Sequence, residues 1–149
     1  MTSSTGTFTL NAREIQQFVA DWYAALDRHV PFEEVERYLD PTSVRFVFPE
    51  VTVAERDGLR DWYERVTRTF FDEVHRLDVA DVDLQGDHAR VHVVVNWTTR
   101  IWNPPEAKSK ILSYDADQEW IVVPGPDGRP ALRDYVVNGL TPVGDTPAF

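Results

Sequence analysis

The chain has 149 residues, 42% hydrophobic and 12% aromatic, which fits one globular domain with a sizeable core and excludes a disordered chain. Its net charge of −10 argues against nucleic acid and anionic membranes as partners, because both require basic protein surface. The absence of cysteine excludes disulfides, a thiol nucleophile and a cysteine-type zinc site. No apolar run approaches the ~18 residues of a membrane span, and the N-terminus lacks a basic-then-apolar signal, so we expect a cytoplasmic protein.

Three helices are predicted from the spacing of apolar residues. The polar residues 1–10 precede them as a flexible arm. Asn11 is a good N-cap, and Glu14 completes a capping box for a first helix that has one apolar face. A short second helix is predicted over residues 32–39, and a third covers residues 57–72.

Strands are predicted where apolar residues alternate with polar ones. The first covers residues 43–48, and the last covers residues 131–138. Between them, the run Val74–Leu84 changes parity partway along. A bulge near Ala80 and Asp81 would keep its apolar side chains on one face.

The longest predicted feature is a hairpin over Ala89–Val123, in which two β-type runs flank a Pro-Pro turn. Strands of this length twist and curl, so their concave face must be filled. The face predicted to point inward carries Val91, Val93, Val95, Trp97, Thr99 and Ile101 in the first run, and Leu112, Tyr114, Ala116, Gln118, Trp120 and Val122 in the second. Gln118 is the one strongly polar side chain among these apolar neighbours.

The order of elements is helix, helix, strand, helix and then antiparallel strands. This order indicates an α+β fold with helices packed on one face of a curved sheet. A sheet curled around helices forms a cone with an open mouth, which is a natural ligand pocket. No repeat or linker indicates a second domain, so residues 11–138 are predicted to form a single domain, followed by an irregular C-terminal tail over residues 139–149.

Several short patterns keep a characteristic order and spacing through this domain. They are Phe18-x3-Trp22-Tyr23-x2-Leu26-Asp27, Tyr38-Leu39-Asp40, Phe46-x-Phe48-Pro49, Gly58-x3-Trp62-Tyr63, His75, Gly86-Asp87-x-Ala89-x-Val91, Trp97 and Arg133-Asp134-Tyr135. Together they resemble the nuclear-transport-factor-2-like superfamily, in particular its SnoaL-like branch. The resemblance implies a cone-shaped, curved antiparallel sheet wrapped around N-terminal helices, the polyketide cyclase or ketosteroid isomerase-like α+β barrel. It does not by itself define a function, because the superfamily contains several kinds of enzyme and non-catalytic members.

The catalytic positions of these relatives are only partly kept. The oxyanion-binding tyrosine and the base aspartate of ketosteroid isomerases fall on Trp22 and Phe46, so dienolate chemistry of that kind is not expected. Asp134 matches the pocket aspartate of limonene-epoxide hydrolases, but the other charged residues of that site have no counterpart. His75 matches a histidine of scytalone dehydratases.

Asp134, His75 and Gln118 are the predicted catalytic residues. An inward-facing Asp134 or His75 suits acid or base work, and Gln118 suits a hydrogen bond to a substrate carbonyl. The alternatives are that Asp134 is a structural partner of an arginine and that His75 is a histidine at the edge of the core.

Aromatic residues are predicted to shape the pocket, with Glu50 at its rim. The predicted substrate-binding residues are Trp22, Phe46, Phe48, Glu50, Trp62, Trp97, Tyr114 and Trp120. A wide aromatic cone suits a large apolar ligand such as a polyketide or polyene, and holding that ligand in a reactive shape removes entropy from the barrier. We therefore predict a cofactor-independent cyclase or isomerase of secondary metabolism. Its reaction could be driven by the shape of the pocket, as in a pericyclic reaction.

Two other functions stay open. The first is a non-catalytic module that binds a ligand or a partner, and the second is an acid–base hydrolase or dehydratase that uses Asp134 and His75. A homodimer through the outer sheet face, where His92, Asn96 and Arg100 share one side, is compatible with each reading. No residue spacing resembles a metal site, so we expect neither a metal nor a cofactor.

Overall fold

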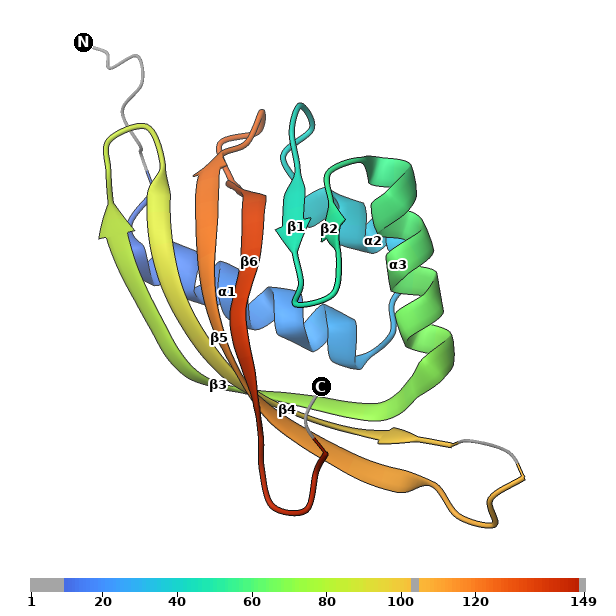
Figure 1. Ribbon diagram of the computed structural model, residues 1–149. Coiled ribbons are helices and arrows are strands. Elements are labelled where there is room, and N and C mark those ends of the chain that lie inside the picture. Colours follow the sequence, from blue (N-terminus) through green and yellow to red (C-terminus); the bar gives the residue numbers. More distant parts are fainter. Residues whose placement is uncertain (1–9, 103–104, 148–149) are drawn as a thin grey trace, which may run out of the picture.

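The computed structural model describes residues 10–102 and 105–147 (Figure 1). Nearly all of the predicted N-terminal arm, part of the predicted Pro-Pro turn and the end of the predicted tail lie outside these described residues. The helices are α1 (Ala12–Asp27), α2 (Phe32–Val35), the 3-10 turn η1 (Glu36–Tyr38) and α3 (Arg56–Thr69). The strands are β1 (Arg45–Val47), β2 (Thr52–Val53), β3 (Phe70–Leu84), β4 (Ala89–Ile101), β5 (Lys110–Pro124) and β6 (Pro130–Pro142). None of the described helices is long and apolar enough to span a membrane.

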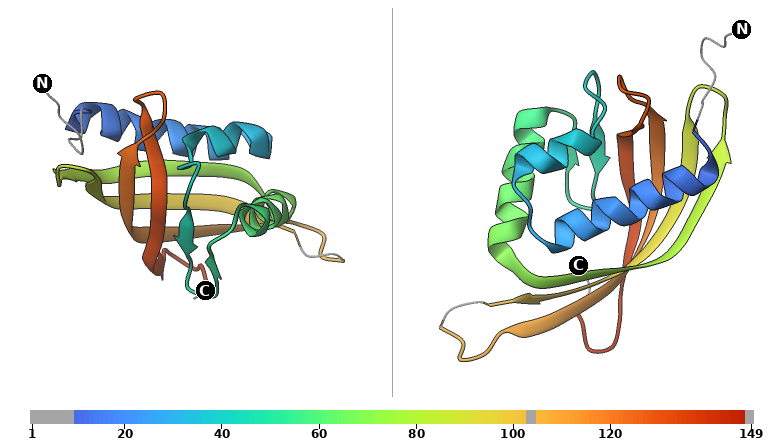
Figure 2. Two further views of the ribbon diagram at one scale, coloured as in Figure 1. Left: turned by 90° about the horizontal axis from the view of Figure 1, so that it is seen from above. Right: turned by 180° about the vertical axis from the view of Figure 1, so that it is seen from behind.

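The strands form one sheet of six strands in the order β2-β1-β6-β5-β4-β3. Neighbouring strands are antiparallel except for β1 and β6, which run parallel. The long strands β3 to β6 bend together, α1 lies across their concave side, and α3 stands beside β1 and β2 (Figures 1 and 2). This arrangement confirms the predicted α+β fold with a curved sheet around helices. The sheet does not close into a barrel, because β2 and β3 are free edges.

Helix α1 is positioned by its N-cap and its apolar face. The side chain of Asn11 accepts a hydrogen bond from the backbone N–H of Glu14 at 2.8 Å, as the sequence predicted. The buried residues of the helix are Ile15, Phe18, Val19, Trp22, Tyr23, Ala25 and Leu26. The helix ends at Asp27, and His29 then adopts a left-handed backbone conformation with a φ of 50°. Both residues are thereby held against the start of β3.

The inward face predicted for the long hairpin is confirmed. The ladder between β4 and β5 runs without a bulge from Ala89 opposite Val122 to Ile101 opposite Lys110, so the alternation in the sequence carries over directly into the structure. The buried residues on its concave side include Val91, Val93, Val95, Tyr114, Ala116, Gln118, Trp120 and Val122.

Bulges interrupt the alternation in β3. One bulge lies at Asp78, which is an extra residue between the two registers of the ladder with β4, and not at the predicted Ala80 and Asp81. Because of this extra residue, Leu77 and Val82 both pack against the core although their positions differ in parity. The need for a bulge was therefore predicted correctly, while its position was not.

A bulge in β6 overturns the prediction for Asp134. Arg133 is an extra residue between the two registers of the ladder with β5, so Leu132 and Tyr135 both face the core. Asp134 consequently points to the outer face, where guanidinium nitrogens of Arg45 and Arg133 lie 3.8 and 3.5 Å from its carboxylate. The prediction that Asp134 faces the pocket was wrong, because it assumed unbroken alternation along this strand.

Strand β6 is also longer than predicted. It continues past Asn138 to Pro142, so the first part of the predicted irregular tail belongs to the sheet. A second bulge at Asn138 shifts the register again, and Val137 and Leu140 both face the concave side.

An aromatic cluster forms the centre of the core. The ring of Trp22 lies 6.0 Å from Phe46, 6.2 Å from Trp120 and 6.0 Å from Tyr135, measured between ring centroids. Trp22, Phe46 and Trp120 are at most 1% exposed. Rings of this size bury the largest apolar areas of any side chain, so this cluster carries much of the hydrophobic stabilisation.

Replacing Trp22 with alanine should lower the free energy of unfolding by about 3–5 kcal/mol, because it leaves a cavity in this cluster. The matched control is Trp102→Ala, since Trp102 is 54% exposed and should cost no more than about 1 kcal/mol. Urea unfolding of the two variants measures both changes. Equal losses would contradict the central position of Trp22.

Candidate active site

A cavity of about 350 Å³ lies between α3, the end of α1 and the concave face of β3 to β6. Its volume falls at the lower end of the range of small-molecule sites. The apolar part of its wall is formed by Leu26, Phe48, Trp62, Val66, Phe70, Val95, Trp97, Ala116, Val137 and Leu140. The polar part includes Glu50, Tyr63, Thr67, Glu73, His75, Gln118 and Tyr135.

The structure separates the predicted site residues into two groups. Those that line the cavity are Phe48, Glu50, Trp62, His75, Trp97 and Gln118. Those that do not line it are Trp22, Phe46, Tyr114, Trp120 and Asp134. The prediction that Trp22, Phe46 and Trp120 line the pocket was wrong, because their rings meet in the core and fill the deep end of the cone. Tyr114 is wrong for a related reason: its ring is buried and its hydroxyl donates to the backbone carbonyl of Pro147 at 2.9 Å.

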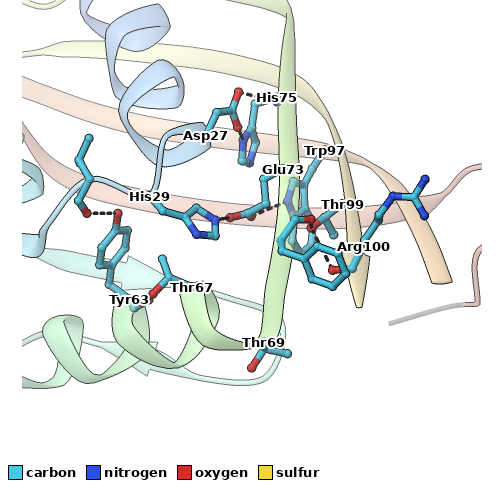
Figure 3. A network of polar contacts seen from close by, with 12 residues as sticks. Asp27, His29, Tyr63, Thr67, Thr69, Glu73, His75, Trp97, Thr99 and Arg100 are labelled. Carbon is cyan, nitrogen blue, oxygen red and sulfur yellow. Dashed lines mark hydrogen bonds and ion pairs between the residues drawn. The ribbon is translucent and has the colours of Figure 1, made fainter. Parts of the chain in front are cut away.

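His75 and Asp27 form a carboxylate–imidazole pair at the cavity wall. Nδ1 of His75 lies 2.6 Å from Oδ1 of Asp27, and the backbone N–H of His75 donates to Oδ2 at 3.0 Å (Figure 3). Because the carboxylate is an acceptor, Nδ1 carries a proton, so Nε2 is the nitrogen that has a lone pair in the neutral ring. The imidazole is stacked between Tyr23 and Trp97, at centroid distances of 4.7 and 6.2 Å. This ring is fixed in the tautomer and orientation of a general base.

Glu73 and His29 form a second pair beside the first. One carboxylate oxygen of Glu73 accepts the indole N–H of Trp97 at 2.9 Å, and the other is bonded to Nε2 of His29 (Figure 3). Glu73 is only 8% exposed and is the one buried acidic or basic side chain of the described residues. In this pair the carboxylate lines the cavity, whereas in the first pair the imidazole does.

Sequence reasoning missed Asp27, His29 and Glu73 as site residues. A signal was present: Asp27-Arg28-His29 follows the end of the first helix, and Glu73-Val74-His75 lies near the start of the strand β3. Two acid-x-His patterns at the ends of elements are candidates for mutual pairing. That they meet follows only from the packing of α1 on β3, which the sequence does not show.

Gln118 is held by two donors in the buried wall. Its Oε1 accepts from the hydroxyl of Tyr23 at 2.9 Å and from the indole N–H of Trp120 at 2.8 Å. An indole nitrogen can only donate, so Trp120 fixes which end of the amide is oxygen. The NH₂ group is then the part of Gln118 that can donate to a molecule in the cavity.

Two tyrosines extend this network. The hydroxyls of Tyr23 and Tyr135 lie 3.2 Å apart, and Tyr135 lines the cavity. Burial raises the pKa of Tyr135 to about 12 and raises the pKa of Tyr23 well above its ordinary value. Both phenols therefore stay protonated near neutral pH. Since Tyr23 donates to Gln118, Tyr135 has a proton to offer to Tyr23 or to a bound molecule.

The functional groups on the cavity wall are thus an imidazole, carboxylates, an amide, phenols, threonine hydroxyls and the guanidinium of Arg65. Across residues 10–102 and 105–147, no three or more His, Cys, Asp or Glu side chains are grouped so that they would hold a metal ion. What this arrangement can do chemically is proton transfer beside hydrogen-bond donors, at an apolar surface.

The raised tyrosine pKa values predict a loss of stability in alkali. The folded state holds the Tyr135 proton more tightly than the unfolded chain, whose tyrosine pKa is about 10. Stability is therefore complete below pH ~10 and falls as the pH rises towards 12. Tyr135→Phe should remove roughly 1–3 kcal/mol of this alkaline loss, although it costs about 1 kcal/mol at neutral pH through the lost hydrogen bond.

Urea unfolding at neutral pH and at several alkaline pH values measures this effect. The control is Tyr38→Phe, because Tyr38 is less buried than Tyr135 and should change the alkaline loss less. An identical pH dependence of wild type and Tyr135→Phe would contradict the role given to burial.

Comparison with solved structures places this geometry among known folds. A proposed dehydratase of the NTF2-like family from Streptomyces avermitilis superposes with a TM-score of 0.71 at 18% identity, covering 88% of this chain and 95% of that one. A proposed scytalone dehydratase from Novosphingobium aromaticivorans superposes with a TM-score of 0.68 at 21% identity, covering 91% of this chain and 89% of that one. ActVI-ORFA from Streptomyces coelicolor superposes with a TM-score of 0.66 at 16% identity, covering 85% of this chain and 94% of that one. At these identities the likeness shows a shared fold.

Sequence comparison identifies the family. No curated protein matches the sequence significantly. The family described as the SnoaL-like domain matches residues 9–120, which is well over half of the chain. Together with the NTF2-like fold of the neighbours, this match means that the chain belongs to the SnoaL-like domain family.

Proposed function

We propose that this chain is an acid–base enzyme that removes a proton from a carbon atom next to a carbonyl group. The observation that carries the proposal is the His75–Asp27 pair at the wall of an apolar cavity. A base of this kind starts isomerisations, dehydrations and aldol-type cyclisations alike, because each begins with an enolate or enol. The proposal thus includes the cyclase or isomerase predicted from the sequence and also the dehydratase kept as an alternative, with proton transfer in place of shape as the source of catalysis.

In this proposal Nε2 of His75 takes the proton, and Asp27 stabilises the imidazolium that forms. The electron pair of the broken C–H bond moves into the enolate, so negative charge develops on the carbonyl oxygen. The NH₂ group of Gln118 and the hydroxyl of Tyr135 are the donors that would receive this oxygen. Donors fixed in a buried wall stabilise such charge better than water does, because they need no reorganisation.

The substrate that fits this cavity is flat and largely apolar. The rings of Phe48 and Trp62 stack 4.6 Å apart at one side of the cavity, and Trp97 forms another side. A cavity of about 350 Å³ suits a substrate of one or two rings better than a long folded polyene. The shape-driven cyclisation predicted from the sequence also loses support, since three of its aromatic residues belong to the core.

The named neighbours support the same class of reaction. Two of them carry the name dehydratase, and a ketosteroid isomerase-like protein from Erwinia carotovora superposes with a TM-score of 0.69 at 16% identity, covering 92% of this chain and 99% of that one. These names describe those proteins. They agree with the chemistry that we derive for this cavity from its own side chains.

The proposal predicts catalysed exchange of carbon-bound hydrogen. In D₂O, the wild-type protein should speed the incorporation of deuterium next to the carbonyl group of benzylacetone, a probe with one ring and one ketone. His75→Ala should lower the catalysed rate by about 10²–10⁴-fold, the usual contribution of a general base. Proton NMR of the probe measures the rate.

The matched control is His92→Ala. His92 is an exposed histidine on the outer face that also contacts a carboxylate, Oδ1 of Asp117, at 3.3 Å. This variant should exchange the probe as fast as the wild type. If the wild type is no faster than His75→Ala, the proposed function is wrong.

A further inference from the structure

The two carboxylate–imidazole pairs have opposite orientations. In the first pair His75 lines the cavity and Asp27 supports it; in the second pair Glu73 lines the cavity and His29 supports it. Glu73 and His75 are two residues apart on β3, so their side chains lie on the same face of the strand. The cavity therefore presents a base and a carboxyl group side by side.

Backbone strain is concentrated at the second pair. Within the described residues, His29 and Asp72 are the non-glycine residues with positive φ, at 50° and 51°. His29 is a member of the pair, and Asp72 directly precedes Glu73 in a bulge of β3 opposite β4. Such conformations cost of order 1 kcal/mol or more each, and they persist where the surrounding structure requires them. The packing of the chain thus holds Glu73 and His29 together against a local cost.

The second pair also connects the cavity with solvent. The side chain of Glu73 is 5% exposed, whereas that of His29 is 27% exposed. The bond between Oε2 of Glu73 and Nε2 of His29 joins the buried carboxyl group to this accessible ring. A proton can therefore pass from water to His29 and on to Glu73 without crossing the cavity. In the first pair the accessible member is Asp27, whose side chain is 24% exposed, so the imidazole of His75 can return its proton to water past this carboxylate.

We infer that Glu73, recharged by His29, is a second proton-transfer group that protonates a leaving oxygen, so that the substrate class is a β-hydroxy ketone. The inference rests on the proposed function, because His75 must first remove a proton from the carbon that lies between the carbonyl carbon and the carbon bearing the hydroxyl group. The C–H electron pair forms the new C=C bond, and the C–O bond breaks with its electrons on oxygen. That oxygen takes a proton from Glu73 while Glu73 takes one from His29, and water leaves. His75 then releases its proton to solvent, and His29 takes one up, so the reaction is neutral overall.

The test uses the aldol adduct of acetone and benzaldehyde, which has the ring and ketone of benzylacetone with a hydroxyl on the β carbon. Its dehydration to benzalacetone is followed by ultraviolet absorbance. Glu73→Gln should lower this dehydration by about 10²–10³-fold, the range expected for loss of an acid catalyst. Deuterium exchange of benzylacetone needs the base alone, so it should fall by a much smaller factor, and the ratio of the dehydration rate to the exchange rate should drop at least about tenfold.

The acetate ester of the same adduct separates acid catalysis from a structural role. Acetate leaves without being protonated, so Glu73→Gln should slow elimination of the ester far less than it slows dehydration of the hydroxy ketone. Glu119→Gln is the matched control, since Glu119 is a partly exposed carboxylate bonded to Arg90 on the outer face, and it should change none of the rates. His29→Asn is a second variant that suits a left-handed backbone, and it should lower dehydration of the hydroxy ketone selectively as well.

Each outcome decides between the two proposals. Equal losses in exchange, dehydration and ester elimination in Glu73→Gln would show that Glu73 only supports the structure and would overturn the inference. Dehydration at the wild-type rate in both Glu73→Gln and His29→Asn would overturn it as well. In both cases benzylacetone exchange that depends on His75 would leave the proposed function standing.

Discussion

The join between the end of α1 and the start of β3 is the constraint on which the site depends. Two carboxylate–imidazole pairs cross it, and each pair has one member on the helix side and one on the strand side. A buried carboxylate without a partner costs several kcal/mol, so separating the two elements would be strongly unfavourable. The same contacts that fasten the helix to the sheet therefore fix the position of the groups that face the cavity.

The aromatic residues of the cone are divided between stability and ligand binding. Trp22 and Trp120 fill the closed end, Trp62 and Trp97 line the cavity, and Tyr135 lies between the two layers. Tyr135 packs on both core indoles and presents its other side to the cavity. The depth of the cavity is thus set by core residues.

Much of the fold followed from local patterns. The alternation in the long hairpin predicted which faces of β4 and β5 are buried, because that ladder contains no bulge. Pocket residues such as Trp97 and Gln118 were predicted from the same alternation. The prediction failed for Asp134, where one extra residue in β6 reverses the parity. The position of a bulge depends on how the whole sheet curves, so it could not be predicted from the residues of the short segment around it.

The site itself could be predicted only in part, for a different reason. His75 was found because it lies beside Leu77 and Val79 in the predicted strand and matches a histidine of the family that the sequence resembles. Asp27, His29 and Glu73 were missed, since their importance comes from a meeting of two elements that are far apart in the sequence. Even the correct contacts would not have assigned roles. Both pairs join a carboxylate to an imidazole, and in the mechanism that we propose only the direction in which each pair faces the cavity makes one side chain a base and the other a source of protons. That direction is fixed by the period of two along β3 and by the turn that follows α1, so the chemistry of this cavity is a property of how helix and strand are joined.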